Sequence, residues 1–437
     1  MMAEVRFRAG SGGSLSGQVR VPGDKSISHR SIMLGSLAEG VTRVSGFLEG
    51  ADSLATLAAF RAMGVTIAGP DDGRVEINGV GLHGLRAPDG PLYLGNSGTS
   101  MRLLTGLLAG QSFDVTLTGD ASLSGRPMKR VTAPLSDMGA RIDSTIDDTA
   151  PLVIHGGQQL HGIDYAMPVA SAQVKSSLLL AGLYAQGRTC VSEPATTRNH
   201  TERMLEGMGY PLTYKDDWVC LDGGHALTAI DIDIPADISS AAFFLVGASI
   251  APGSDLVLQH VGMNPTRTGI IDILRMMGAR IEVDNERDVG GEPVADLHVQ
   301  FATLAGIEIP PELVPLAIDE FPVIFIAAAC AEGRTVLSGA AELRVKESDR
   351  IQVMADGLKT LGVAAEATPD GMIIDGVAID GGSIDSHGDH RIAMAFAMAA
   401  LRAHGEIEIR DCANVNTSFP GFVDLAARAG LGINIEQ

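Results

Sequence analysis

Residues 21–33 read VPGDKSISHRSIM, and the rest of the chain can be organised around this stretch. A Pro-Gly break precedes Asp24 and Ser26, residue types that accept hydrogen bonds from the free amides at a helix start. The pattern therefore predicts that a strand ends here and that a helix begins. Lys25 and Arg30 place two cations near the positive end of that helix, which is a suitable place for a phosphate.

A similar phrase, IPADISSA, occupies residues 234–241, and its proline follows the first one by 213 positions (235 − 22), about half of the 437-residue chain. A repeat of this length predicts two similar domains. We expect an inserted domain over residues 25–234 and a second domain built from residues 1–24 and 235–437. Residues 22–25 and 234–237 would then form the hinge.

The chain is acidic, with 32 Lys and Arg against 53 Asp and Glu and a net charge of −21. This charge disfavours nucleic acid and anionic membrane surfaces as partners. The start MMAEVRFRAG has no apolar signal core, and no apolar run reaches the ~20 residues of a membrane span. The cysteines form no CxxC pair, so reduced thiols in a cytoplasmic protein are expected for Cys190, Cys220, Cys330 and Cys412.

The chain also contains six copies of a smaller unit of helix, strand, helix and strands. The first helix of each copy is apolar on nearly all sides and is expected at the centre of an α/β domain, whereas the second has a polar outer face. Glycines that suit C-caps follow the first helices at Gly40, Gly110, Gly187, Gly253, Gly333 and Gly405. The second helices end before Gly64, Gly139, Gly209, Gly278, Gly362 and Gly430. Each domain would contain three units.

Polar residues recur at the starts of the six central helices. They include Lys25, Ser26 and Arg30; Asn96, Ser97, Gly98, Thr99 and Arg102; Ser171, Gln173 and Lys175; Asp237 and Ser239; Asp319 and Glu320; and Asp389, His390 and Arg391. Asp, Ser and Thr in such places are usually helix caps. Capping does not explain the cations, because the helix dipole disfavours them there. Lys25, Arg30, Arg102 and Arg391 therefore suggest bound anions.

Two further runs are rich in charge: residues 124–130, SGRPMKR, and residues 344–350, RVKESDR. Either run could be only a solvated face or a group of surface salt bridges. Asp319 could likewise serve as a cap or as a catalytic group. Together, a basic cluster with two carboxylates, Asp319 and Glu347, would suit metal-free acid–base chemistry on phosphorylated substrates.

Six motifs in order, VPGDKSISHR, LGNSGTSMR, SGRPMKR, SAQVKSS, RVKESDR and GDHRIAMAF, resemble the 5-enolpyruvylshikimate-3-phosphate synthase family over essentially the whole chain. The resemblance implies an inverted α/β barrel of two three-unit domains. It also implies transfer of the enolpyruvyl group of phosphoenolpyruvate to the 5-hydroxyl of shikimate 3-phosphate, with release of phosphate, in aromatic amino-acid biosynthesis. We expect a monomer that uses no cofactor and no metal.

The same resemblance assigns roles to the residues that match the family's motifs. Asp319, Glu347 and Lys25 would be catalytic. The shikimate 3-phosphate ligands would be Lys25, Ser26, Arg30, Ser171, Gln173, Asp319 and Lys346. The phosphoenolpyruvate ligands would be Lys25, Asn96, Gly98, Arg126, Gln173, Arg350 and Arg391.

The chain departs from the commonest branch of the family at Thr417, where that branch has Lys, and at Glu342, where it has Asn. It is more similar to the second class, whose glyphosate-tolerant members have Ala where Gly98 stands, so inhibition by glyphosate is expected. UDP-N-acetylglucosamine enolpyruvyl transferases resemble the chain less, because no cysteine precedes Cys190. A non-catalytic anion-binding protein is the other alternative.

Overall fold

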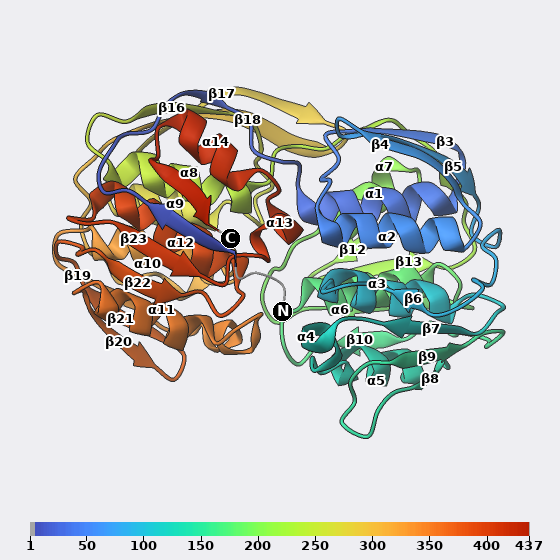
Figure 1. Cartoon of the computed structure of the whole chain (residues 1–437). Coiled ribbons are helices and arrows are strands. Elements are labelled where there is room, and N and C mark those ends of the chain that lie inside the picture. Colours follow the sequence, from blue (N-terminus) through green and yellow to red (C-terminus); the bar gives the residue numbers. More distant parts are fainter. Residues whose placement is uncertain (1–4, 437) are drawn as a thin grey trace. The chain divides into compact units, whose positions relative to one another are not determined.

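The computed structural model describes residues 5–436, so residues 1–4 and 437, which are part of the second domain expected from sequence, lie outside the described residues. The chain forms two compact units. The N-unit contains Gly23–Ile234 and Val289–Gly291, and it is drawn mainly in blue to green in Figure 1. The C-unit contains the chain up to Pro22, Pro235–Asp288 and the residues from Glu292 onward. Each unit has an α/β fold with three sheets.

Each unit has three apolar helices at its centre (Figure 1). They are α1 (Lys25–Leu37), α3 (Gly98–Ala109) and α6 (Ala172–Gly182) in the N-unit, and α8 (Ile238–Ile250), α10 (Phe321–Ala329) and α12 (His390–Ala399) in the C-unit. Every residue of α8 and α10 is buried. The prediction that the first helix of each copy is central is confirmed.

Five of these six helices begin with a side-chain cap of the expected kind. The caps are Asp24, Ser97, Ser171, Asp237 and Asp389, each of which accepts a hydrogen bond from an amide of the first turn. The sixth helix, α10, starts after Glu320, which makes no side-chain cap bond. Asp319 therefore does not occupy the N-cap position of α10.

The second helix of each copy is amphipathic and ends where the sequence predicts. These helices are α2 (Ala51–Ala62), α5 (Lys129–Asp137), α7 (His200–Gly207), α9 (Gly269–Met276), α11 (Arg350–Thr360) and α14 (Phe422–Ala429). The six glycines after them all have positive φ, from 80° to 121°. Glycine suits this left-handed conformation, which closes the helix.

The prediction of C-caps at the other six glycines is wrong except at Gly110. The central helices end earlier because the chain must turn directly into a strand. Gly40, for example, lies inside strand β3, three residues after α1 ends at Leu37.

The three sheets of the N-unit share one pattern. In each sheet, the strand that follows a central helix pairs in parallel with a strand at the edge of the sheet. One sheet has the order β10-β11-β13-β12 and a second has β6-β7-β9-β8. In the third, β3 pairs with β14 and β15 from the end of the last copy, which closes the three copies into a ring. The strands are β3 (Ala38–Ser45), β4 (Thr66–Asp71), β5 (Arg74–Val80), β6 (Leu92–Tyr93), β7 (Val115–Thr118), β8 (Arg141–Asp143), β9 (Leu152–His155), β10 (Asp164–Ala166), β11 (Arg188–Ser192), β12 (Thr213–Lys215), β13 (Trp218–Asp222), β14 (Leu227–Thr228) and β15 (Ile232–Asp233).

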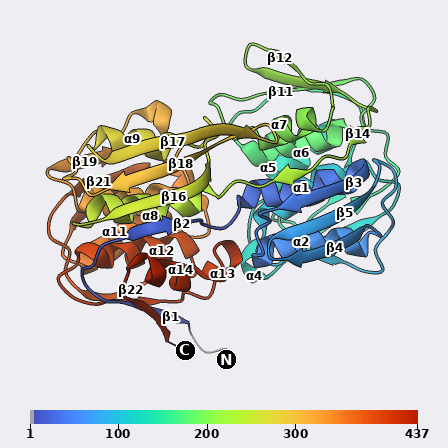
Figure 2. The ribbon, with the colours of Figure 1, turned by 90° about the horizontal axis from the view of Figure 1, so that it is seen from above.

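In the C-unit the N-terminal segment completes two of the three sheets. Strand β1 (Arg6–Ala9) lies between β23 and β24, and β2 (Ser16–Val19) runs parallel to β16, beside which Figure 2 shows it in blue. The other strands are β16 (Asp255–Gly262), β17 (Arg280–Val289), β18 (Glu292–Gln300), β19 (Arg334–Leu337), β20 (Ala364–Thr368), β21 (Gly371–Asp375), β22 (Gly382–Asp385), β23 (Ile407–Arg410) and β24 (Ile433–Glu436). Short helices complete the fold: α4 (Ala121–Ser124), α13 (Val415–Ser418), η1 (Pro311–Leu313), η2 (Ala341–Val345) and η3 (Ala400–Arg402).

Close packing of the central helices α3 and α6 depends on Gly106. A Cβ atom at this position would lie 2.0 Å from the carbonyl oxygen of Ser177. At the same crossing the Ser177 hydroxyl donates to the carbonyl oxygen of Arg102, at 2.9 Å. The backbones of the two helices approach closely because Gly106 has no side chain.

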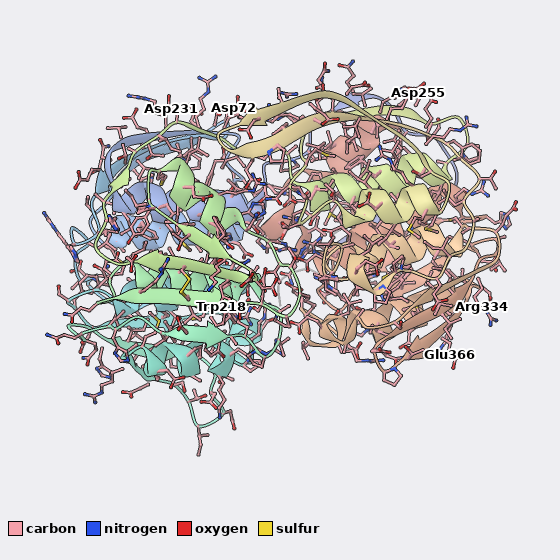
Figure 3. The ribbon with its side chains drawn as sticks, turned by 180° about the vertical axis from the view of Figure 1, so that it is seen from behind. Asp72, Trp218, Asp231, Asp255, Arg334 and Glu366 are labelled. Carbon is pink, nitrogen blue, oxygen red and sulfur yellow. A yellow bond between two sulfur atoms is a disulfide. The ribbon has the colours of Figure 1, made fainter. Side chains whose placement is uncertain are left out.

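The prediction of reduced cysteines is wrong for one pair. Cys190 on β11 lies directly opposite Cys220 on β13, and their sulfurs form a disulfide. Trp218, which is labelled in Figure 3, lies on the same strand as Cys220. Sequence spacing could not reveal this pair, because it arises from the register of two strands that are not adjacent in sequence. Cys330 and Cys412 are free thiols.

Charged side chains cover the outer strands of the C-unit. Arg334 and Glu366, both labelled in Figure 3, point away from the ribbon, and Arg334 pairs with Asp375 at 2.8 Å. Such exposed pairs add little stability. Among residues 5–436 no helix is long and apolar enough to cross a membrane.

Two glycines at the end of α7, Gly207 and Gly209, test whether glycine at a positive φ stabilises the protein. Gly209 has φ 80° and open space around it, so Gly209→Ala should lower the free energy of unfolding by about 1–2 kcal/mol through backbone strain alone. Gly207→Ala is the matched control. Its Cβ would meet nothing closer than 3.7 Å and its helical backbone favours alanine, so stability should stay equal or rise. Urea unfolding measures both, and equal losses would contradict the argument.

Candidate functional site

The start of α1 brings Lys25 beside an acidic partner. Asp24 caps the helix through the amide of Ile27, at 2.8 Å. The ammonium of Lys25 lies 2.5 Å from a carboxylate oxygen of Asp52, which belongs to α2. The Lys25 side chain is 24% exposed, whereas that of Asp52 is 7% exposed. The ion pair therefore fixes the cation while leaving it within reach of solvent.

Arg30 lies one turn further along α1, and its guanidinium is held by three hydrogen bonds. It donates to the carbonyl oxygen of Ser26 at 2.9 Å, to the hydroxyl of Thr201 at 2.7 Å and to the hydroxyl of Ser176 at 2.8 Å. Only 4% of Arg30 is exposed. These bonds join α1 to α6 and α7. The sequence does not indicate the roles of Ser176 and Thr201, because both lie far from Arg30 in the chain.

The loop before α3 forms a second set of contacts. Asn96 donates to Asp120 at 2.7 Å and accepts from the guanidinium of Arg126 at 2.5 Å. Gln173, at the start of α6, accepts from Arg102 at 2.5 Å and donates to Thr99 at 3.0 Å. The N-unit therefore brings together the predicted residues of the Asn96 loop, Arg126 and Gln173.

Gly98 leaves space for two guanidinium groups. A Cβ atom at this position would lie 3.1 Å from NH1 of Arg102 and 3.1 Å from NH1 of Arg126. Both contacts are closer than ordinary van der Waals distance, so a methyl group would push the guanidinium groups outward. Because Gly98 has no side chain, the guanidinium groups of Arg102 and Arg126 can both approach its backbone closely.

A buried chain of polar side chains lies beneath this loop. Nδ1 of His29 is 2.7 Å from the hydroxyl of Thr56, which is 2.6 Å from the hydroxyl of Ser100. Ser100 donates in turn to the hydroxyl of Ser97, the cap of α3, at 2.7 Å. Burial, followed by the positive charge of Lys25, lowers the pKa of His29 to about 3. His29 is therefore neutral at physiological pH.

In the C-unit the predicted residues gather around Asp319. Nζ of Lys346 and NH1 of Arg350 lie 3.4 Å and 3.5 Å from the same oxygen of Asp319. Glu347 pairs with NH2 of Arg350 at 2.6 Å. The side chain of Asp319 is 13% exposed and that of Glu347 is 31% exposed, so both carboxylates remain accessible.

Arg350 itself is enclosed, with only 1% of its side chain exposed. Its Nε donates to Asp389 at 2.8 Å, and Asp389 also accepts from the hydroxyl of Ser348 at 3.1 Å. Burial acts to lower the pKa of Arg350, but Asp389, Glu347 and Asp319 raise it on balance. Arg350 is a permanent cation that orders these acids. From its position at a helix start, Asp389 is expected only as a cap.

Arg391, the second residue of α12, contacts the backbone of Asp319 and not its side chain. Its NH1 donates to the backbone carbonyl oxygen of Asp319 at 3.0 Å. Within residues 5–436, its Nε and NH2 make no hydrogen bond, so these groups can serve an anion. Ser171 caps α6 through the amide of Val174 at 3.3 Å and can still donate its hydroxyl proton.

The two clusters suit different chemistry. The N-unit cluster, which carries Lys25, Arg30, Arg102 and Arg126, can bind phosphate and carboxylate groups. The C-unit cluster surrounds two accessible carboxylates with cations, an arrangement that can accept and donate protons. No group of three or more His, Cys, Asp or Glu side chains that could hold a metal ion is found within residues 5–436.

His29 makes stability depend on pH. Its pKa is about 3 when folded and 6.5 when unfolded, so below pH 6.5 the unfolded state binds the additional proton. The resulting loss of unfolding free energy should reach about 2 kcal/mol at pH 5, at ~1.4 kcal/mol for each pH unit. His29→Gln should remove this part of the difference between pH 7 and pH 5.

Urea unfolding at the two pH values measures the effect. His404, whose side chain is 70% exposed, provides the control, because His404→Gln should keep the full pH dependence. The same loss of stability in wild type and His29→Gln would contradict the assignment.

Comparisons with known proteins agree on one family. A family model described as EPSP synthase (3-phosphoshikimate 1-carboxyvinyltransferase) matches residues 10–425. A 3-phosphoshikimate 1-carboxyvinyltransferase from Alkalilimnicola ehrlichii is 72% identical over 430 residues, which cover 98% of this chain and 96% of the relative. The protein of the same name from Methylococcus capsulatus is 69% identical, and the match covers 99% of each chain.

Solved structures show the same relationship. An EPSP synthase structure from Acinetobacter baumannii has a TM-score of 0.91 and 58% identity, with 100% of both chains covered. The enolpyruvyl transferase NikO from Streptomyces tendae has a TM-score of 0.79 at 17% identity, with 99% of each chain covered. The second comparison supports the fold alone.

Proposed function

The chain belongs to the EPSP synthase family, and on that premise we propose how its two clusters divide the work of the reaction. The reaction transfers the enolpyruvyl group of phosphoenolpyruvate to the 5-hydroxyl of shikimate 3-phosphate and releases phosphate. It belongs to the shikimate pathway of aromatic amino-acid biosynthesis. The observation that carries the proposed division is that the N-unit cluster is rich in cations, whereas the C-unit cluster holds the accessible carboxylates.

We assign shikimate 3-phosphate to Lys25, Ser26, Arg30, Ser171 and Gln173 of the N-unit, with Asp319 and Lys346 of the C-unit. The buried guanidinium of Arg30 keeps one orientation because three hydrogen bonds hold it. Lys25 and Ser26 lie at the positive end of α1, where negative charge is favoured.

We assign phosphoenolpyruvate to Lys25, Asn96, Gly98, Arg126, Gln173, Arg350 and Arg391. Arg126 and Gln173 are oriented by Asn96 and Arg102, and Gly98 keeps the space between the guanidinium groups open. Arg350 is enclosed by three acids, so its contribution is electrostatic unless those carboxylates move aside. Planar guanidinium groups suit the paired oxygens of carboxylate and phosphate.

The chemistry proceeds by addition and elimination. Asp319 takes the proton of the 5-hydroxyl, whose oxygen bonds to C2 of phosphoenolpyruvate. Glu347, together with Lys25, delivers a proton to C3, which gives a tetrahedral intermediate. Glu347 then removes a proton from the new methyl group as the C–O bond to phosphate breaks, and the proton taken up by Asp319 leaves with the phosphate. A cation lies beside each carboxylate, Lys346 beside Asp319 and Arg350 beside Glu347, and balances its negative charge whenever that carboxylate is ionised.

Phosphate release tests these two roles. Wild type should release phosphate only when both substrates are present, and a chelator should have no effect. Asp319→Asn and Glu347→Gln should each lower kcat by about 10²–10⁴-fold, because each variant loses one proton-transfer group. Substrate binding, measured by calorimetry, should change little. Glu366→Gln, which alters an exposed acid of the same unit, is the control. Near-normal turnover in either variant would remove its assigned role.

Glyphosate inhibition tests the space at Gly98. We propose that the wild type is inhibited, because both guanidinium groups can close on the inhibitor. Gly98→Ala should raise the half-inhibitory concentration by at least about tenfold, since the methyl group displaces Arg102 and Arg126. The KM for phosphoenolpyruvate, a shorter molecule, should rise less.

Gly90→Ala, at a position with nothing within 4 Å, should leave both values unchanged. A wild type that is unaffected by millimolar glyphosate, or a Gly98→Ala variant that is no more resistant, would defeat the proposal.

We also propose that the protein acts in the cytoplasm as a monomer, with small-molecule substrates and without a cofactor or nucleic-acid partner. Its net charge of −21 argues against nucleic acid. Its exposed large apolar side chains, such as Tyr93, Ile146 and Val345, are scattered over different segments. Light scattering should give a mass near 45.4 kDa, and twice that mass would contradict the monomer.

A further inference from the structure

Glu320, which directly follows Asp319, is a buried acid to which the reaction assigns no role. Only 1% of its side chain is exposed. It precedes α10 but makes no side-chain cap bond, so it does not serve the helix that it begins. Burying a carboxylate is unfavourable unless its partners compensate for the loss of water. The partners of Glu320 should therefore reveal its role.

One set of partners lies at the start of α8. The hydroxyl of Ser239 donates to Oε1 of Glu320. NH2 of Arg267 donates to the same hydroxyl at 2.6 Å and to Asp237 at 3.1 Å, and it lies 3.9 Å from Oε1 of Glu320. Ser239 and Arg267 therefore fix the position of the Glu320 carboxylate.

The other partner is Arg391. Its NH1 lies 3.8 Å from Oε1 of Glu320 and donates to the backbone carbonyl oxygen of Asp319 at 3.0 Å. The carbonyl oxygen and the carboxylate thus hold one end of the guanidinium. Within the described residues, Nε and NH2 of Arg391 make no hydrogen bond, so Glu320 holds the end of Arg391 opposite to the groups that a ligand would use.

We propose that Glu320 is a positioning residue that aims Arg391 at phosphoenolpyruvate and couples it to the peptide of Asp319. The inference rests on the proposed role of Arg391 as a phosphoenolpyruvate ligand. Because Arg391 is bonded to the peptide that carries Asp319, the anion contact and the proton acceptor keep a fixed relation. Ser239 and Arg267 support Glu320 in this role.

A purely structural role makes a different prediction. If Glu320 only neutralised Arg267, then removal of either charge would destabilise the protein and removal of both would restore it. Substrate binding would then follow stability and would not distinguish between the two substrates. The experiment therefore has to separate stability from the selective loss of one substrate.

Glu320→Gln keeps the shape of the side chain and removes its charge. The KM for phosphoenolpyruvate should rise by about tenfold, as expected for one lost charge-assisted contact, whereas the KM for shikimate 3-phosphate should change less than about twofold. Glu320→Asp retains the charge on a shorter stem and should recover part of the affinity. Equal rises in both KM values would overturn the proposal.

Two double variants complete the test. Glu320→Gln in an Arg391→Gln background should cause no further rise in the KM for phosphoenolpyruvate, because both changes affect the same contact. Glu320→Gln with Arg267→Met should recover the thermal midpoint but not the affinity for phosphoenolpyruvate. Recovery of both would show a structural role only.

Arg391→Gln alone distinguishes a failure of the proposed ligand role of Arg391 from a failure of the positioning role of Glu320. If it leaves the KM for phosphoenolpyruvate unchanged, the proposed ligand role of Arg391 is wrong, and the role of Glu320 fails with it. If Arg391→Gln weakens phosphoenolpyruvate and Glu320→Gln does not, only the role of Glu320 is wrong. For variants with very slow turnover, calorimetric titration of phosphoenolpyruvate into enzyme saturated with shikimate 3-phosphate replaces the KM.

Discussion

A helix that is buried on every side must satisfy its first backbone amides without water, and this constraint shapes both units. Asp24, Ser97, Ser171, Asp237 and Asp389 meet it with side-chain oxygens. The remaining amides and the helix dipole still make each helix start positive. The fold therefore provides anion-seeking positions as a consequence of burying its central helices.

Cations at such positions need compensation, since the dipole repels them. Asp52 compensates Lys25 at the start of α1, and Glu320 lies near Arg391 at the start of α12. Each acid comes from a different helical segment than the cation that it faces. The contacts between elements therefore decide where each functional cation points, and the packing of the helices cannot be separated from the geometry of the site.

Much of the fold could be predicted because its signals are local. Caps, left-handed glycines such as Gly209, and the alternation of apolar and amphipathic helices all depend on residues a few positions apart. The pairing of Cys190 with Cys220 and the bond from Arg30 to Thr201 depend on strand register and helix packing across long separations. No pattern in the sequence specifies these distances. The motifs identified Arg350, but its burial against Asp389 became visible only in the folded chain.

Charge is distributed unequally between the clusters. In the N-unit, Lys25, Arg30, Arg102 and Arg126 face two named acids, Asp52 and Asp120, which gives an excess of two positive charges (4 − 2). In the C-unit, three cations, Lys346, Arg350 and Arg391, face four acids, which gives an excess of one negative charge (3 − 4). These acids are Asp319, Glu320, Glu347 and Asp389. Screening limits the effect of the other charges to about 8–10 Å, so a strongly acidic protein can still attract anions locally.

This difference implies that the C-unit cations mainly serve the carboxylates beside them. Arg350 orders three acids and has almost no exposed surface, so it has little capacity left for a ligand. Arg391 is the exception, because its Nε and NH2 make no bond within the described residues. Because the C-unit cluster has no excess of positive charge, the orientation of the Arg391 guanidinium decides whether it can bind an anionic substrate. A buried acid that fixes that orientation can therefore affect catalysis without touching a substrate.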